Sequence, residues 1–268
     1  MMLKLLNYER KRLVKSNCFW IILLVTSLFA VISIVLIRNI PTFLTAIDAD
    51  IVQIENSLRD LGIPFRLFGS DALIFGAGDF LSIPLTILIA VLFASEFSNG
   101  TIKNVLSKGY PRTSVYLSKL ISCCAAVTII VFASASISSV FATIFWGFSD
   151  GIVLWGRLVV IFFVQLLAFY AIVSLAAFVS SIIRNTAGAV AANIVLFAFF
   201  PSILTFSAML QGLDHMFFTR FEITNIIASL TDSVTVGTGD IIRTLCVSLV
   251  YIGITSTAGI VVFNRRDI

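Results

Sequence analysis

Six long apolar stretches run along the sequence, separated by shorter polar segments. They cover approximately residues 18–37, 73–95, 120–146, 158–183, 187–210 and 241–263. Each reaches the length of about 20 residues that an α-helix needs to cross the hydrocarbon core of a bilayer. No internal repeat and no Ser-, Gly- or Pro-rich linker divides the chain. The pattern therefore predicts an all-α polytopic membrane protein with six transmembrane helices in a single domain, residues 1–268.

The composition supports this class of protein and excludes others. Hydrophobic residues make up 59% of the chain and charged residues 12%, about half the charged share of a soluble domain. The mean hydropathy is +1.07, which excludes a disordered chain and an ordinary soluble globule. The four cysteines all lie in apolar stretches and show no C-x-x-C spacing. They predict neither a disulfide framework nor a metal site.

The distribution of lysine and arginine predicts the orientation. An even number of crossings places both termini on one side of the membrane, and 12 of the 18 Lys and Arg residues lie on that side. The segments on that side are residues 1–17, the loop 96–119, Arg184 and the tail 264–268. Positively charged residues close to membrane spans are retained in the cytoplasm. We therefore expect both termini to be cytoplasmic.

Two segments outside the spans have helical patterns. Residues 1–17 place leucines at helical spacing among basic side chains, which predicts an amphipathic elbow helix along the inner membrane surface. A basic flank that only sets the topology is the alternative. On the outer side, residues 41–64 repeat an apolar residue every three or four positions with acidic residues between them, which predicts an amphipathic helix. It packs on the spans, packs on a second copy or binds substrate. The fold of residues 211–240 stays open.

The chain has few of the groups that catalysis needs. His215 is the only histidine and lies in an outer loop, which argues against His-rich zinc sites and Ser–His pairs among the spans. No G-x-x-x-x-G-K-[ST] motif occurs, so the chain carries no P-loop ATPase and is not expected to be an enzyme by itself. Asp79 is the only acid within or beside an apolar run. It is either an ion site or a solvated, capped residue at the interface.

A few residues inside the spans are candidates for a substrate path. Gln165 and Asn193 are polar groups deep in the bilayer, and Pro201 interrupts the fifth span and predicts a bend. Each amide either lines a passage or bonds a neighbouring helix. Small residues at four-residue spacing predict a close helix contact in the third span: Ser134, Ser138 and Ala142.

The loop 96–119 between the second and third spans contains a predicted short amphipathic helix. Asn99 or Thr101 caps its start, and Gly109 marks its end. Its apolar residues share one face, which we expect to be presented to a cytoplasmic partner: Ile102, Val105 and Leu106. Its two lysines suit either an acidic partner or anionic lipid headgroups: Lys103 and Lys108.

This loop resembles the corresponding loop in permease subunits of type-two ABC exporters, the group that includes bacitracin-resistance and lantibiotic-immunity transporters. In that family the loop reads approximately E-x-x-x-G-T-x-K-x-x-L, followed by Pro, Arg and a Lys that opens the third span. The matching residues are Glu96, Gly100, Thr101, Lys103, Leu106, Pro111, Arg112 and Lys119. The basic N-terminal segment and the ending at residues 263–268 also resemble those of the family.

The resemblance implies a permease that pairs with a second copy or a sister permease and with two cytoplasmic ABC ATPase subunits. The loop is then the coupling helix, and the residues that couple to the ATPase are Glu96, Gly100, Thr101, Ile102, Lys103, Leu106, Pro111 and Arg112. ATP and Mg²⁺ bind the partner, with no cofactor in this chain and no nucleic acid. The implied setting is the bacterial cytoplasmic membrane, and the implied task is export of, or protection against, an amphipathic peptide antibiotic or drug.

Two other classes of protein stay open. One is a secondary transporter or channel driven by an ion gradient, for which Asp79 is the only plausible titratable group in the spans. The other is a membrane scaffold or sensor that binds a partner through the same loop without transporting anything.

Overall fold

The computed structural model describes residues 2–46, 67–107, 109–148, 155–183, 185–210, 221–231 and 236–265. These residues form helices and no strand. Six helices are long and apolar enough to cross a membrane: Asn17–Ile40, Asp79–Ser98, Arg112–Trp146, Trp155–Ile182, Thr186–Ile203 and Thr238–Arg265. The prediction of an all-α protein with six membrane spans is confirmed.

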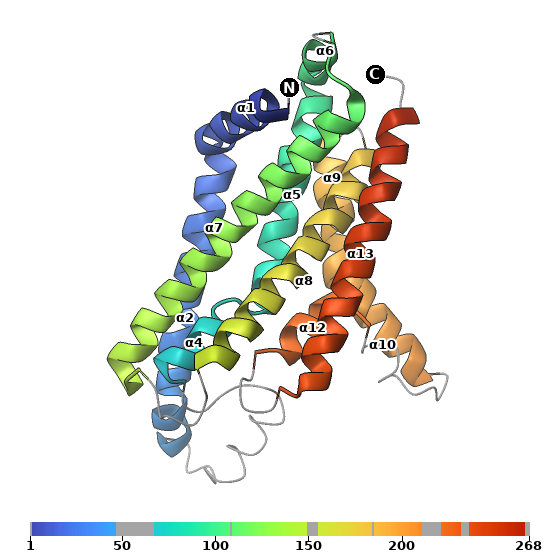
Figure 1. Cartoon of the computed structure of the whole chain (residues 1–268). Helices are drawn as coiled ribbons and strands as arrows, with labels where there is room; N and C mark the ends of the chain where they lie inside the picture. Colours follow the sequence, from blue (N-terminus) through green and yellow to red (C-terminus); the bar gives the residue numbers. More distant parts are fainter. Residues whose placement is uncertain are drawn as a thin grey trace.

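The elements follow one another up and down the bundle (Figure 1). In chain order they are α1 (Met2–Lys15), α2 (Asn17–Ala46), α4 (Gly69–Phe75), the 3₁₀ turn η1 (Asp79–Leu81), α5 (Ser82–Ser98), α6 (Thr101–Leu106), α7 (Arg112–Trp146), α8 (Trp155–Ile182), α9 (Thr186–Ile194), the π-helical turn η2 (Val195–Phe199), α10 (Phe200–Leu210), α12 (Ile223–Ser229) and α13 (Thr238–Arg265). Both termini lie at the end that carries α1 and α6, and we call this the basic end. Helices α4 and α12 lie toward the opposite end.

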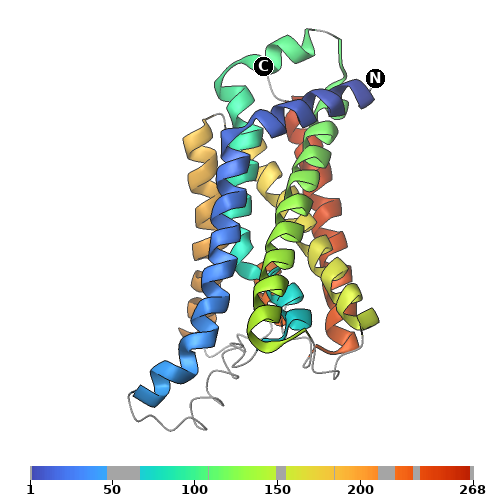
Figure 2. The ribbon, with the colours of Figure 1, turned by 90° about the vertical axis from the view of Figure 1, so that its left-hand side faces the viewer.

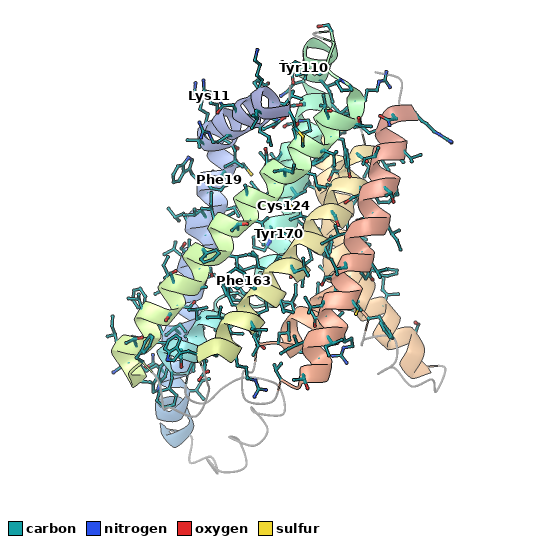
Figure 3. The ribbon with its side chains drawn as sticks, in the orientation of Figure 1. Lys11, Phe19, Tyr110, Cys124, Phe163 and Tyr170 are labelled. Atoms are coloured by element: carbon teal, nitrogen blue, oxygen red, sulfur yellow. The ribbon has the colours of Figure 1, made fainter. Side chains whose placement is uncertain are left out.

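Helix α1 lies across the basic end of the bundle and makes a sharp turn into α2 (Figure 2). Every fourth residue of one face is buried, namely Leu5, Glu9 and Leu13. Four basic side chains on the other faces are exposed, namely Lys4, Arg10, Lys11 and Lys15, and Lys11 points away from the bundle (Figure 3), whereas Arg12 is half-buried. This is the geometry expected of an amphipathic elbow helix.

Helix α8 forms the centre of the bundle, and the helices around it each have one face that is exposed. Two thirds of the most apolar window of α8 is buried, against 17% for the span in α13. A hydrogen bond of 2.8 Å joins Thr255 of α13 to Ser174 of α8. The outer faces of α2, α7 and α13 expose large apolar side chains such as Leu24, Ile144 and Ile254. An apolar surface of this extent is unusual for a soluble monomer and is suited to lipid.

The second span begins later than the sequence pattern predicts. The apolar stretch starts at residue 73, but residues 69–75 form the separate helix α4 and the chain turns through 76–78 before η1 and α5. Small residues allow α4 to lie directly on α7. A Cβ atom at Gly76 would come within 2.6 Å of Ser138 Oγ. Hydropathy alone does not register such a turn, because the turn residues are themselves apolar or small.

The predicted close contact of the third span is confirmed, and its partner is α4. Ser134 Oγ donates a hydrogen bond of 2.8 Å to the carbonyl oxygen of Gly76, and Ser138 and Ala142 are fully buried on the same face of α7. A Cβ atom at Gly69 would overlap the Thr143 hydroxyl of α7. The small-residue spacing therefore marks a contact between two helices within this chain.

The outer segments are described in part. Helix α2 continues to Ala46, so the predicted start of a separate outer helix at Pro41 is wrong, and residues 47–66 lie outside the described chain. In the second outer segment, α12 begins after Glu222, whose carboxylate accepts hydrogen bonds from the amides of Thr224 at 3.0 Å and Asn225 at 2.7 Å. This is a side-chain N-cap. Residues 211–220 and 232–235 lie outside the described chain.

The fifth span contains a π-helical turn immediately before Pro201. Proline lacks an amide hydrogen, and its ring clashes with the carbonyl four residues earlier in an α-helix. The wider π turn at Val195–Phe199 accommodates this defect, and the chain continues as α10. Single π turns of this kind occur often at functional sites.

Candidate functional site

Helix α6 projects from the basic end between α5 and α7 (Figures 1 and 2). Gly100 precedes it with φ of +66° and Gly109 follows it with φ of +77°. Residues with a side chain rarely adopt positive φ, so glycine is favoured at both turns. The predicted short helix is present as Thr101–Leu106, but Gly100 rather than Asn99 or Thr101 precedes its first residue, and it ends three residues before Gly109.

The apolar face of α6 is turned inward, in contrast to the prediction that it faces a partner. Ile102 is 2% exposed and belongs to the main hydrophobic core, and Val105 packs against the same core. The hydroxyl of Thr101 lies 3.5 Å from the carbonyl oxygen of Glu96. Helical periodicity identified the apolar face correctly, but at Ile102 and Val105 this face packs against the hydrophobic core of the bundle.

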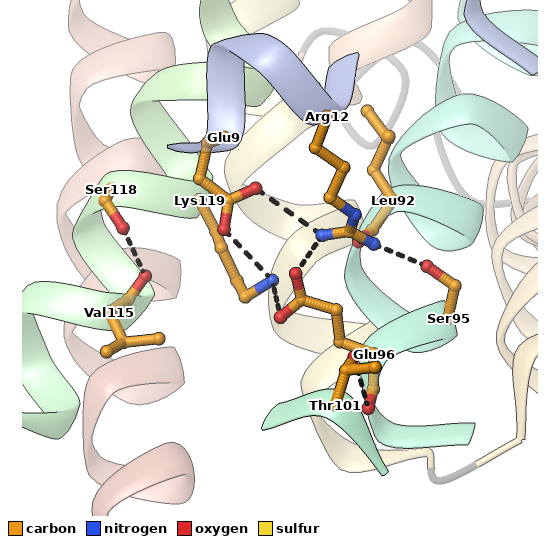
Figure 4. A network of polar contacts seen from close by, with 9 residues as sticks. All are labelled: Glu9, Arg12, Leu92, Ser95, Glu96, Thr101, Val115, Ser118 and Lys119. Carbon is orange, nitrogen blue, oxygen red and sulfur yellow. Dashed lines mark hydrogen bonds and ion pairs between the residues drawn. The ribbon is translucent and has the colours of Figure 1, made fainter. Parts of the chain in front are cut away.

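Four charged side chains meet beneath α6, at the base of the hairpin that carries it (Figure 4). Glu9 and Arg12 come from α1, Glu96 from α5 and Lys119 from α7. Glu96 is the centre of the cluster, because one carboxylate oxygen pairs with Arg12 Nη1 and the other with Lys119 Nζ. Glu9 lies 3.4 Å from each of the same two cations. We call these four residues the ionic cluster.

Three members of the ionic cluster are buried, Arg12 is partly exposed at 23%, and the four charges balance. Glu9 is 8% exposed, Glu96 is 3% and Lys119 is 2%, and the two acids match the two bases. Removing one partner of a buried ion pair costs about 3–5 kcal/mol, because the other charge stays buried and unpaired. The cluster therefore holds α1 in a defined place on α5 and α7.

Arg12 also bonds α5 by two contacts outside the carboxylates. Its Nη2 donates hydrogen bonds to the carbonyl oxygen of Leu92 at 3.1 Å and to Ser95 Oγ at 2.7 Å. The nearby Tyr8 responds to the same environment. Partial burial, followed by the Glu96 carboxylate, raises the pKa of Tyr8 above its ordinary value, so its hydroxyl stays protonated at neutral pH.

A second set of contacts attaches α13 to the same hairpin. Phe263 of α13 packs against Phe97 of α5 and Tyr116 of α7, with ring centroids 5.8 Å apart in both pairs. Gly259 lies directly beneath the Tyr116 hydroxyl, where a Cβ atom would overlap it. Arg112 Nη1 donates a hydrogen bond of 3.0 Å to the carbonyl oxygen of Asn264, near the C-terminal end of α13. A cation is favourable at that end of a helix.

The structure places the residues of this loop in several different settings. Gly100, Thr101 and Ile102 shape and anchor α6, while Glu96 and Lys119 belong to the ionic cluster beneath it. Pro111 is the N-cap residue of α7, and Arg112 begins that helix and reaches α13. Lys103 and Leu106 lie on α6, and their side chains are outside the described part. Glu96 was expected to couple directly to a partner; its buried side chain instead joins three helices.

Sequence reasoning missed Glu9 and Arg12 as members of this site. The two were read as part of a basic segment, although Glu9 is the only acid among residues 1–17. One signal in the sequence could have indicated this site. It is a single acid that lies three positions before an arginine, on the apolar face of an amphipathic helix. The partners on α5 and α7 lie more than 80 residues away in the sequence, so the pairing itself needs the fold.

Of the three candidates for a substrate path, Pro201 lies at a cavity and the two amides lie elsewhere among the described residues. Pro201 borders a cavity of about 310 Å³ between α8, the fifth span, α12 and α13, but Gln165 and Asn193 are not among its lining residues. Asn193 Nδ2 donates hydrogen bonds of 2.9 Å to Ser180 Oγ and to the Ala189 carbonyl, which supports a packing role. Gln165 is 0% exposed, and its amide has no hydrogen-bond partner among the described residues.

Asp79 lies at the outer end of the second span as the first residue of η1. Ser82 Oγ lies 2.6 Å from both the Asp79 carboxylate and its backbone carbonyl oxygen. Asp79 therefore accepts a local hydrogen bond from the Ser82 hydroxyl, and its side chain does not cap the start of η1 or of α5. Among the described residues, no three His, Cys, Asp or Glu side chains are grouped closely enough to hold a metal ion.

Comparison with known proteins supports the assignment that the loop suggests. The model of the family described as "ABC-2 family transporter protein" matches residues 3–268, nearly the whole chain. A search of curated proteins finds no match. The family match, the six spans and the helix carried on the basic end agree with one another, and the chain belongs to the ABC-2 family of transporter proteins.

Proposed function

We propose that this chain is the permease subunit of an ATP-driven ABC exporter and that α6 is its coupling helix. The observation that carries the proposal is the placement of α6: it lies across the basic end in the loop between α5 and α7 (Figure 2), flanked by two glycines with positive φ, and Ile102 is buried in the hydrophobic core. A helix held in this way can transmit a push from a cytoplasmic partner to both spans. Family membership supports the same role.

The proposal assigns the energy source to other chains. Two cytoplasmic ABC ATPase subunits bind ATP and Mg²⁺, and a second copy of this chain or a sister permease completes the membrane part. The concentration of lysine and arginine at the basic end supports a cytoplasmic position for that end, and we assign the complex to a bacterial cytoplasmic membrane. Closure of the ATPase pair on ATP moves α6, and hydrolysis resets it. Such coupling requires contacts that differ between the two states.

The proposed substrate is an amphipathic peptide antibiotic or drug. Support comes from the cavity of about 310 Å³, which lies within the usual size range of ligand sites. Its wall includes Phe197, Phe200 and Tyr251, and the Glu222 residue provides a polar border. Aromatic and apolar walls suit a ligand with a large apolar face.

The test is a photo-crosslinker placed at Lys103 on α6, followed by purification in mild detergent and identification of the attached protein by mass spectrometry. We expect a P-loop ATPase. The matched control carries the crosslinker at Thr238, an exposed residue at the opposite end of the bundle, and should capture no ATPase. Efficient crosslinking at Lys103 without any ATPase would contradict the proposal.

A further inference from the structure

We propose that the ionic cluster is a rigid joint that makes α1, and through it the first span α2, follow the movement of α6. This inference rests on the proposed function in one respect, that a partner moves α6. The residues act by position: they touch no ligand, and they join three helices that meet beneath α6 (Figure 4).

The cluster lies where movement of α6 must pass. Glu96 is two residues before the end of α5, and Lys119 is within the first turns of α7. These are the two helices that carry α6, and the Glu96–Lys119 pair ties them together. Arg12 then joins α1 to α5, and Glu9 joins α1 to α7. A displacement of the hairpin therefore acts on both charged residues of α1.

The turn from α1 into α2 is short and braced. Ser16 is the only residue between the two helices, and its amide donates a hydrogen bond of 3.0 Å to the carbonyl oxygen of Leu13. Trp20 of α2 reaches back across the turn, where its indole Nε1 donates a hydrogen bond of 2.8 Å to the carbonyl oxygen of Val14. A bent unit with these two bonds transmits a displacement of α1 to the start of α2.

The ionic character of the joint matters for its stiffness. Apolar contacts are non-directional and permit sliding, whereas buried charges lose several kcal/mol when a partner is withdrawn. The cavity beside Glu9, Arg12 and Lys119 measures about 10 Å³, which is at most the space of one water molecule. The space between the charged groups is therefore too small for a water molecule to take the place of a lost partner of Lys119, which is itself 2% exposed, and the joint favours one arrangement.

The test measures whether α1 and the hairpin move together, using the full chain with its ATPase in lipid nanodiscs. The four native cysteines are replaced by alanine, and spin labels are placed at exposed positions. The pair Lys4 and Ser98 reports the distance between α1 and the hairpin, and the pair Ser98 and Thr238 reports movement of the hairpin relative to the opposite end of α13. Each distance distribution is recorded without nucleotide and with trapped ATP.

We expect the Lys4–Ser98 distance to stay constant between the two states while the Ser98–Thr238 distance changes. The double variant Arg12→Gln/Glu96→Gln removes one charge of each sign and leaves Glu9 and Lys119 paired. In it the Lys4–Ser98 distribution should broaden, and the Ser98–Thr238 distance should still respond to ATP. The control Asp240→Asn/Arg243→Gln removes an ion pair of 3.0 Å at the opposite end and should leave the Lys4–Ser98 distribution narrow.

Two results would overturn the joint: a Lys4–Ser98 distance that changes with ATP in the unaltered cluster, or a distribution that stays narrow in the double variant. Failure of the proposed function would give a different result, because the Ser98–Thr238 distance would then be the same with and without ATP. The widths of the Lys4–Ser98 distributions of the unaltered chain and the double variant, both recorded without nucleotide, would still test the joint. If the double variant does not fold, Arg12→Lys retains the charge but cannot reproduce the planar fork that reaches Leu92 and Ser95. It should broaden the Lys4–Ser98 distribution as well, and an unchanged width would count against the joint.

Discussion

Replacing Lys119 by methionine should destabilise the protein far more than the loss of an exposed lysine would. Lys119 is 2% exposed and pairs with both acids of the ionic cluster. Its loss leaves Glu9 and Glu96 buried with only Arg12 between them. Breaking a buried pair in this way costs about 3–5 kcal/mol, which at about 1.4 kcal/mol per factor of ten is more than a hundredfold in the unfolding equilibrium constant. The double variant Glu9→Gln/Lys119→Met retains the balanced Arg12–Glu96 pair and should recover most of this loss.

The free energies of unfolding can be measured by SDS titration in mixed micelles for the unaltered chain, both single variants and the double variant. We expect a strong coupling free energy between the two substitutions. This coupling should depend little on salt concentration, because Glu9, Glu96 and Lys119 are buried. A cost below about 1 kcal/mol for Lys119→Met, the range of an exposed ion pair, would refute this expectation. A double variant as unstable as the sum of the two single variants would do the same.

Three further substitutions test other parts of the structure. Gly259→Ala should lower the thermal stability, since the new methyl group overlaps the Tyr116 hydroxyl, whereas Gly253→Ala in the same helix faces open space and should be neutral or stabilising; equal effects of the two would contradict the packing of α7 on α13. Gly100→Ala forces a side chain into φ of +66°, at a cost of about 1–2 kcal/mol, and should weaken ATPase co-purification while membrane insertion persists. Asp79→Asn should leave transport in reconstituted vesicles unchanged, and loss of transport would favour a carrier driven by an ion gradient.

The spans could be predicted because a single physical requirement governs them. A bilayer demands about 20 apolar residues in a helix, and this length is visible in the sequence without knowledge of any contact. The boundary at α4 and α5 could not be predicted in the same way. Residues 73–78 are as apolar as a span, and the turn between Gly76 and Gly78 depends on a fit to Ser134 and Ser138 of another helix.

The sequence predicted which residues belong to the site more successfully than it predicted the directions in which their side chains point. Gly109 could be placed at a turn because positive φ favours glycine in any context, whereas Gly100 was expected only through its match to the family loop. The inward direction of Ile102 could not be predicted, since periodicity defines a face of a helix but not what covers it. For Glu96 the family pattern pointed to an important residue, but only the fold shows that its partners are Arg12 and Lys119.

The π turn in the fifth span determines which side of α10 faces the cavity. A π turn holds one more residue per hydrogen-bonded ring than an α turn, and each residue of an α-helix turns the chain by about 100°. Without the extra residue, everything after Phe199 would be rotated by that angle relative to α9. Pro201 would leave the cavity wall. Phe206, whose side chain is 65% exposed, would point in a different direction as well. The register of this half-span is therefore determined by a single inserted residue, and a one-residue deletion there would change which side chains of α10 line the cavity.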